Sequence, residues 1–162
     1  MSGSATRSDH TPEVEPRLSI HQQRILFALR RISHDFATFS RQLRFECRVT
    51  LPQLVCLLAV VDHGPLTPSA IGRRVCLSKS TLVGILDRLE AGGLIARERS
   101  RRDRRHVIVR ATEAGRALAD SAPAPLPSGL AAALDTLPAH EQEEVARSLE
   151  RLTMLIEDGP AA

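Results

Sequence analysis

Aromatic residues are scarce in this sequence. Its 162 residues include no tryptophan, no tyrosine and only four phenylalanines. Proteins that bind single-stranded nucleic acid usually stack the bases on aromatic side chains. The composition therefore argues against that class of protein, whereas binding to duplex DNA requires no such stacking surface.

Cysteines and long apolar runs are scarce as well. The three cysteines, Cys47, Cys56 and Cys76, are an odd number with no Cys-x-x-Cys pair, which argues against a disulfide framework and a zinc knuckle. No apolar run approaches the roughly 20 residues of a membrane span, and the polar N-terminus does not resemble a signal peptide. We therefore expect a cytoplasmic protein without a membrane partner.

The residue patterns of catalysis and metal binding are missing too. Ser, His and Asp are present, but no nucleophile elbow, phosphate-binding loop or metal-ligand spacing accompanies them. Four of the histidines, which a metal sensor would need to cluster with other ligands, are scattered: His34, His63, His106 and His140. The sequence thus predicts a protein that is not an enzyme and has no catalytic residues, metal or cofactor.

Positive charge is modest overall but concentrated in one place. The formal net charge is +3, and the hydrophobic content of 43% is enough for the core of one domain or one subunit. Seven arginines lie between Arg97 and Arg110, against only Glu98 and Asp103. Such a local cluster indicates an anionic partner more strongly than the total charge does.

Two short helices are predicted just before this cluster. Thr67 suits the cap of the first helix, with Pro68 at the first helical position, where its missing N–H costs nothing. Ser78 suits the cap of the second helix, residues 79–90, which Gly92-Gly93 would end. The second helix has a buried stripe at helical spacing: Leu82, Ile85, Leu86 and Leu89.

The pattern then changes from helix to strand. Residues 94–99 and 106–110 look like two strands, joined by the polar tip 100–105. Helix, turn, helix and a hairpin with an arginine-rich tip is the order of a winged helix-turn-helix. We predict a mainly α fold with a small β-hairpin wing.

Helices are expected on both sides of this module. Residues 1–17 cannot bury a core and should form a disordered tail, while residues 18–48 form a helix longer than a core of this size needs. The winged helix-turn-helix domain takes residues 49–111. Residues 112–162 form further helices, interrupted by prolines at positions 123, 125 and 127. We expect the two flanking segments to be dimerisation helices of a homodimer.

Several motifs carry a family resemblance. The run from Leu77 to Ile95, the wing residues Asp103-Arg104-Arg105 and Thr112-Glu113-Ala114-Gly115 resemble the MarR family of transcriptional regulators. The resemblance implies a twofold dimer whose N- and C-terminal helices interlock. Short matches at residues 40–43 and 122–126, with the 80–90 run, further resemble regulators of ectoine and related compatible-solute synthesis, which implies an osmotic signal.

The residues predicted to bind DNA lie on the second helix and on the wing: Lys79, Ser80, Thr81, Gly84, Arg88, Arg101, Arg102, Asp103, Arg104 and Arg105. By resemblance, Asp103 orients Arg105 into the minor groove. The alternatives are an exposed helix without a partner, a solvated basic loop and a plain surface ion pair. Asp87-Arg88 could instead tie the helix to the wing or to the domain body. Arg73 and Arg74, placed after the first helix, could touch phosphates or stay solvated.

The cysteines allow a redox hypothesis. Arg44 and Arg48 could lower the pKa of Cys47, which makes it the redox candidate, while Cys56 and Cys76 are expected to be small hydrophobes inside helices, a role also open to Cys47. The predicted function is a homodimeric repressor that binds a pseudo-palindromic operator in double-stranded DNA. A small-molecule, osmotic or redox signal would release it, although no residue is singled out for an effector. The rival class is a winged-helix protein–protein interaction module without specific DNA binding.

Overall fold

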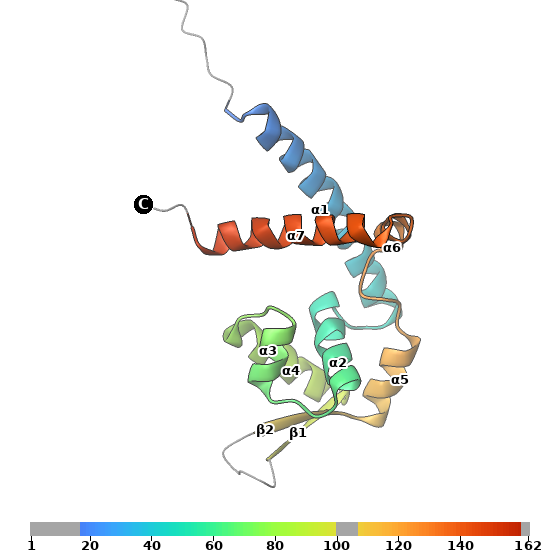
Figure 1. Ribbon diagram of the computed structural model, residues 1–162. Coiled ribbons are helices and arrows are strands. Elements are labelled where there is room, and N and C mark those ends of the chain that lie inside the picture. The colour runs from blue at the N-terminus through green and yellow to red at the C-terminus, as the bar shows by residue number, and fades with distance from the viewer. Residues whose placement is uncertain (1–16, 100–106, 160–162) are drawn as a thin grey trace, which may run out of the picture. The chain divides into compact units, whose positions relative to one another are not determined.

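The computed structural model describes residues 17–99 and 107–159, which form helices and one hairpin. Figure 1 shows the elements, in the order α1 (Ile20–Glu46), α2 (Leu51–His63), α3 (Pro68–Arg74), α4 (Lys79–Ala91), β1 (Ile95–Arg99), β2 (Val107–Ala111), α5 (Glu113–Ser121), α6 (Ser128–Asp135) and α7 (Ala139–Glu157). The predicted mainly α fold with a hairpin wing is confirmed. The chain divides into two units, Met1–His34 and Asp35–Ala162. Within the described ranges, no helix is long and apolar enough to cross a membrane.

The predicted caps of the two central helices are confirmed. The Thr67 hydroxyl accepts a hydrogen bond from Ala70 N at 3.2 Å, and the Ser78 hydroxyl accepts one from Thr81 N at 3.3 Å. Each bond satisfies a backbone donor that a helix start leaves free. The chain leaves α4 through Gly93, whose φ of 70° requires the left-handed region that glycine adopts at low cost.

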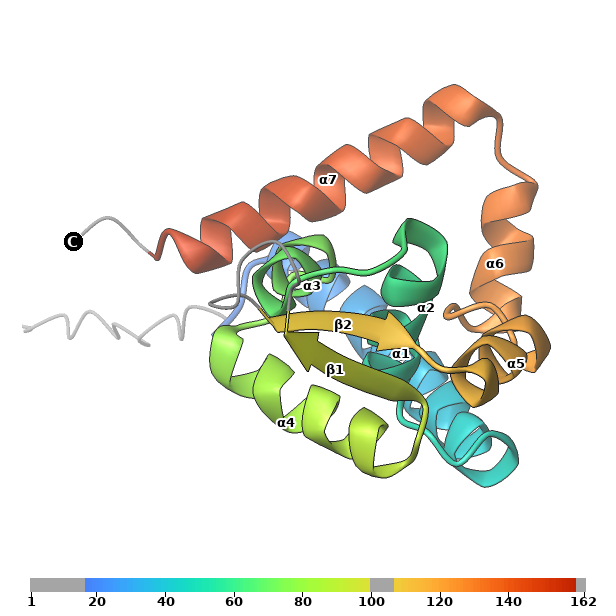
Figure 2. The ribbon, with the colours of Figure 1, turned by 90° about the horizontal axis from the view of Figure 1, so that it is seen from below.

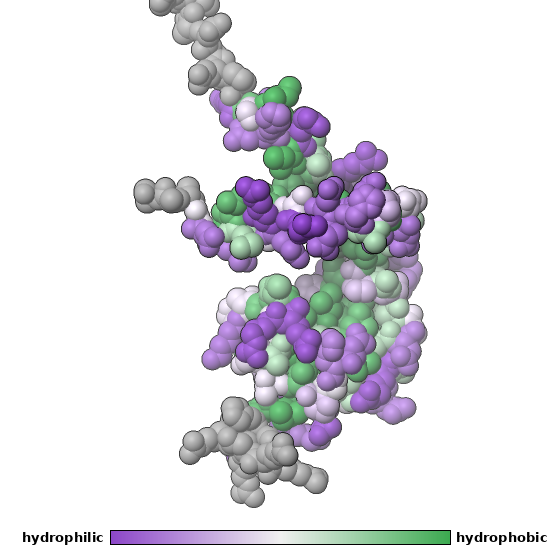
Figure 3. Space-filling view, in the orientation of Figure 1, coloured by the Kyte–Doolittle hydropathy of each residue, from purple (hydrophilic) through white to green (hydrophobic). Residues whose placement is uncertain are grey.

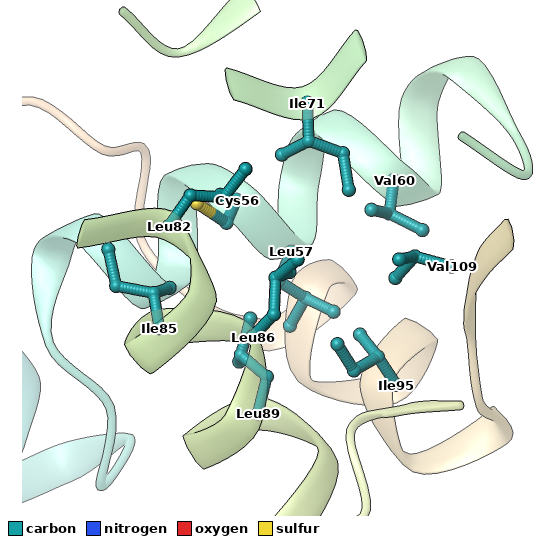
Figure 4. Close-up of a cluster of buried hydrophobic side chains, with 10 residues drawn as sticks. All are labelled: Cys56, Leu57, Val60, Ile71, Leu82, Ile85, Leu86, Leu89, Ile95 and Val109. Carbon is teal, nitrogen blue, oxygen red and sulfur yellow. The ribbon is translucent and has the colours of Figure 1, made fainter. Parts of the chain in front are cut away.

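One core joins α2, α3, α4 and both strands, which together are called the winged unit below. Figure 4 shows its ten buried side chains: Cys56, Leu57, Val60, Ile71, Leu82, Ile85, Leu86, Leu89, Ile95 and Val109. The predicted stripe of α4 supplies four of them, so the stripe is confirmed. Because that face of α4 is anchored in the core, the opposite face is left to solvent.

A second cluster holds the end of α1 against α2. Phe39 and Leu43 of α1 are buried with Val49 and Leu54, and Cys47 packs against them. Thr50 begins α2 with a capping box, in which its N–H donates to Gln53 Oε1 at 2.8 Å. The second cluster therefore holds the C-terminal part of α1 against α2 of the winged unit.

The hairpin lies next to α4. Figure 2 shows β1 between β2 and α4. The strands are antiparallel, with Ile95 opposite Ala111 and Arg97 opposite Val109. Leu66, just before α3, adds a bridge to the outer side of Val109, with N···O distances of 2.8 and 3.1 Å. The base of the wing is therefore attached to the helix-turn-helix at two points: through Leu66 before α3, and through the turn from α4 into β1.

The helix α2 ends at Gly64, which takes a positive φ of 76°. Two local predictions need correction. Arg73 and Arg74 do not follow α3 but form its last turn. Cys76 lies in the turn after α3 with a φ of 51°, and its side chain is exposed rather than inside a helix.

Helices α1 and α7 expose large apolar side chains in this single chain. Figure 3 shows apolar surface, in green, on both helices. No residue of α7 is buried, and its exposed set includes Val145, Leu149, Met154, Leu155 and Ile156. On α1 the exposed set includes Ile20, Ile25, Leu26, Phe27, Leu29 and Phe45. Monomeric proteins rarely expose so many apolar side chains, which favours a partner surface.

Candidate nucleic-acid interface

The outer face of α4 carries small, hydroxylated and basic side chains. Lys79, Ser80, Thr81 and Arg88 are exposed and Gly84 is half-buried. Each of these residues was singled out in the sequence, and the structure places all of them on the one helix whose other face is in the core. A helix that is anchored on one side and free on the other can enter a groove as wide as the major groove of DNA.

Gly84 is a glycine that the described part of the chain does not require. A Cβ atom added there would meet no atom of the described residues within 4 Å, and the φ of Gly84 is not positive. A glycine inside a helix costs roughly 0.5–1 kcal/mol of stability relative to alanine. The glycine therefore lowers the stability of α4, and no contact within the winged unit requires it. It leaves open space next to the helix backbone.

The hydroxyl groups at the start of α4 are arranged by one another. Ser78 Oγ lies 2.9 Å from Thr81 Oγ1 and 3.2 Å from Ser80 Oγ. They cluster at the positive end of the helix dipole, in the same first turn as the exposed residue Lys79. This end of α4 is suited to a negatively charged partner such as a phosphate group.

Arg97 of β1 ties the wing to α4. Its Nη1 lies 2.6 Å from Asp87 Oδ1 and 3.6 Å from Glu90 Oε2, and its backbone N donates to Glu90 Oε1 at 3.1 Å. The sequence predicts that Asp87-Arg88 could tie the helix to the wing. The sequence also places Arg97 in the arginine cluster that is expected to face an anionic partner. Its guanidinium is instead occupied by two carboxylates of the neighbouring helix.

The other arginines of the hairpin and of the two central helices differ in their surroundings. Arg110 pairs with Glu98 across the hairpin, with Nε and Oε2 3.2 Å apart. Arg88 is exposed on α4, and Arg73 and Arg74 are exposed on α3. The predicted wing-tip residues, 101–105, lie outside the described residues.

The motif Thr112-x-x-Gly115 locks the wing base to α5. Thr112 Oγ1 donates to Gly93 O at 2.6 Å and accepts from Gly115 N at 3.0 Å, and Thr112 N donates to Leu94 O at 3.1 Å. The backbone of Gly115 then passes so close to Leu94 that a Cβ atom would lie 2.0 Å from Leu94 O. The motif thus fixes the direction in which both strands leave the helix-turn-helix.

Comparisons with known proteins agree with this geometry. The model of the MarR family matches residues 49–107. The organic hydroperoxide resistance transcriptional regulator of Bacillus subtilis (strain 168) is 33% identical over 101 residues, which are 62% of this chain and 69% of that protein. The HTH-type transcriptional repressor Rv2887 of Mycobacterium tuberculosis is 33% identical over 104 residues, covering 64% of this chain and 75% of that protein. The chain belongs to the MarR family.

A solved structure of a relative contains DNA. Reduced AbfR bound to DNA is 30% identical, covers 83% of this chain and 93% of that chain, and superimposes with a TM-score of 0.62. These MarR-family relatives are transcriptional regulators rather than enzymes. The protein is therefore a DNA-binding transcriptional regulator of the MarR family.

The three cysteines of this MarR-family chain differ in access. Cys56 is buried, and the loss of hydration raises its pKa to about 11. Its thiol stays protonated at neutral pH and is a poor nucleophile. Cys47, the redox candidate, is partly exposed beside the second cluster, and Cys76 is exposed.

Proposed function

We propose that the protein is a homodimeric repressor that binds a pseudo-palindromic operator. Each α4 lies in a major groove, and each wing lies at the adjacent minor groove. The observation that carries this proposal is the outer face of α4, where Gly84 leaves open space among Lys79, Ser80 and Thr81. Protein partners favour large apolar or aromatic contacts, so a face of small polar groups fits base edges and phosphates better.

The domain organisation follows from the exposed apolar faces. Residues 49–111 form the DNA-binding domain, and residues 18–48 and 112–162 supply the dimerisation helices. Of the tail predicted for residues 1–17, residues 1–16 lie outside the described residues. A second copy of the chain would cover the apolar side chains of α1 and α7. Because the twofold axis relates the two copies of α4, half-sites should be centred about 10 base pairs apart, or a multiple of that spacing.

The roles of the DNA-binding residues divide into reading and positioning. Lys79, Ser80, Thr81, Gly84 and Arg88 face the major groove. Arg101, Arg102 and Arg104 contact phosphates, while Asp103 orients Arg105 into the minor groove. Minor grooves attract arginine because their negative potential is strongest where they are narrow.

Binding should depend steeply on salt. Selection from random duplexes should enrich one pseudo-palindrome, and its affinity should fall by about 10³-fold from 50 to 200 mM salt, as expected for roughly six or more phosphate contacts. Arg101→Ala and Arg102→Ala should weaken binding to all duplexes alike. Fluorescence anisotropy with the selected duplex and an unrelated one measures both effects. A flat salt dependence, or no enriched sequence, would contradict the proposal.

Removing the Arg97 tie should weaken DNA binding more than it weakens the fold. In Arg97→Gln, Asp87 and Glu90 lose their cation and repel the phosphates, and β1 loses its anchor to α4. We expect about a tenfold loss of operator affinity. The loss of stability should be about 1 kcal/mol, because both carboxylate partners of the half-buried Arg97 are exposed to water. Arg110→Gln removes the same charge from the exposed Glu98 pair and serves as the matched control. Equal losses of affinity in the two variants would contradict a positioning role for Arg97.

The release signal is proposed as osmotic on the resemblance to regulators of compatible-solute synthesis. A zwitterionic solute bound by the dimer, or ionic strength acting on arginine–phosphate contacts, could each provide it. A redox signal through Cys47 is the second candidate, favoured by the hydroperoxide-resistance regulator among the relatives. Operator occupancy is measured with ectoine, glycine betaine, potassium glutamate and an organic peroxide. Release by peroxide alone, lost in Cys47→Ala, would replace the osmotic proposal with the redox one.

A further inference from the structure

Val83 is an exposed apolar side chain on the outer face of α4. The other large apolar residues of this helix, Leu82, Ile85, Leu86 and Leu89, are buried, whereas Val83 is 48% exposed. It belongs to neither core cluster. The fold of the single chain therefore gives Val83 no apolar environment in the core.

The neighbours of Val83 are those of the proposed DNA-reading face. Val83 follows Lys79 by four residues and Ser80 by three, so the three side chains lie on one side of the helix. Gly84, the next residue, leaves open space beside it. Val83 thus borders polar groups of α4 on one side, and on the other it lines an open pocket with Pro68, Leu77 and Leu82. Another molecule can approach the helix closely at this point.

Helix stability does not account for a valine at this position. A β-branched side chain loses rotamer freedom in a helix, and several straight-chain residues have a higher helix propensity. An exposed valine also leaves apolar surface in water until a partner covers it. Val83 is therefore better explained by a contact that forms on binding than by a contribution to the fold.

We infer that Val83 is a specificity-determining residue that contacts the C5 methyl group of a thymine in the operator. The inference rests on the proposed function. The thymine methyl is the apolar feature that a base pair presents in the major groove, and apolar side chains recognise it. Cytosine carries only a hydrogen atom at C5, so replacing the thymine with cytosine removes the methyl group that Val83 would contact.

Replacing thymine with deoxyuridine tests this contact because it removes only the methyl group. Each thymine of a duplex selected with the wild-type protein is replaced in turn. At one position in each half-site, the wild-type protein should lose about fourfold in affinity, the effect of burying one methyl group. Val83→Ala should bind the thymine and deoxyuridine duplexes at that position equally well.

Lys79→Ala is the matched control, since Lys79 lies one turn earlier on the same face. It should bind both duplexes more weakly yet keep the fourfold preference for thymine. Thermal melting checks that Val83→Ala is folded, and Val83→Ser, expected to behave in the same way, replaces it if it is not. The inference is overturned if each deoxyuridine costs the Val83 variants as much as it costs the wild-type protein. If the wild-type protein enriches no duplex, the proposed function itself fails.

Discussion

Gly115→Ala should destabilise the winged unit by about 3 kcal/mol, at the upper end of the usual cost of overpacking. The added Cβ would lie 2.0 Å from Leu94 O and 3.2 Å from Leu57 Cδ1. The carbonyl group of Leu94 cannot turn away freely, because it accepts a hydrogen bond from Thr112 N at 3.1 Å. The clash must therefore separate α5 from the base of the wing. Urea denaturation followed by circular dichroism measures the loss.

Gly129→Ala in α6 is the control for this prediction. A Cβ at Gly129 would meet no atom within 4 Å, so alanine should leave stability unchanged or raise it by up to about 1 kcal/mol. Because φ at Gly115 is not positive, the requirement for glycine there is steric and not conformational. A Gly115→Ala protein as stable as the Gly129→Ala protein would show that α5 does not pack against Leu94 as described.

Deletion of residues 139–162 should convert the protein to a folded monomer. This change removes α7, whose exposed Leu155 and Ile156 (62% and 70% exposed) would lie in the dimer interface. Neither core cluster contains a residue of α7, so the winged unit should keep its fold and its cooperative unfolding. Sedimentation velocity measures the mass, and affinity for a two-half-site operator should fall by at least about 100-fold as bivalent binding is lost.

A pair of point variants separates the apolar face of α7 from its charge. Ile156→Glu should weaken the dimer strongly, whereas Arg151→Glu, five residues earlier and therefore on the other side of the same helix, should leave it nearly intact. A truncated chain that still sediments as a dimer would contradict the proposed use of α7. It would place the interface on α1 alone.

The elements of the winged unit could be predicted from the sequence because their signals are local. Thr67 and Ser78 act on backbone groups three residues away, and the apolar stripe of α4 repeats at the helical period. The same reasoning identified the exposed residues of α4, because a helix that buries one apolar face leaves its opposite face exposed to solvent. The family resemblance pointed to Thr112-x-x-Gly115, but its reason, the close approach to Leu94, depends on how α5 meets the strands.

Features that depend on contacts between elements were not predictable in the same way. Arg97 pairs with Asp87 because of the register of β1 and because β1 lies beside α4. Neither of these can be read from the local sequence. The exposure of Cys76 follows from a left-handed turn at a residue other than glycine, for which the sequence gives no clear signal. Val83 was passed over because a valine in an amphipathic helix resembles a core residue until its neighbours are placed.

The central claim, that the outer face of α4 binds the operator, is tested most directly by measuring stability and affinity together in Gly84→Ala. The added methyl group meets no atom of the winged unit, so the free energy of unfolding should rise by about 0.5–1 kcal/mol. In the complex it would occupy the space left for a base edge or the DNA backbone, and operator affinity should fall by about tenfold or more while affinity for an unrelated duplex changes little. Thr81→Ala should show the same preference for loss on the operator. A Gly84→Ala protein that is more stable and binds the operator as tightly as the wild type would contradict the placement of α4 in the groove.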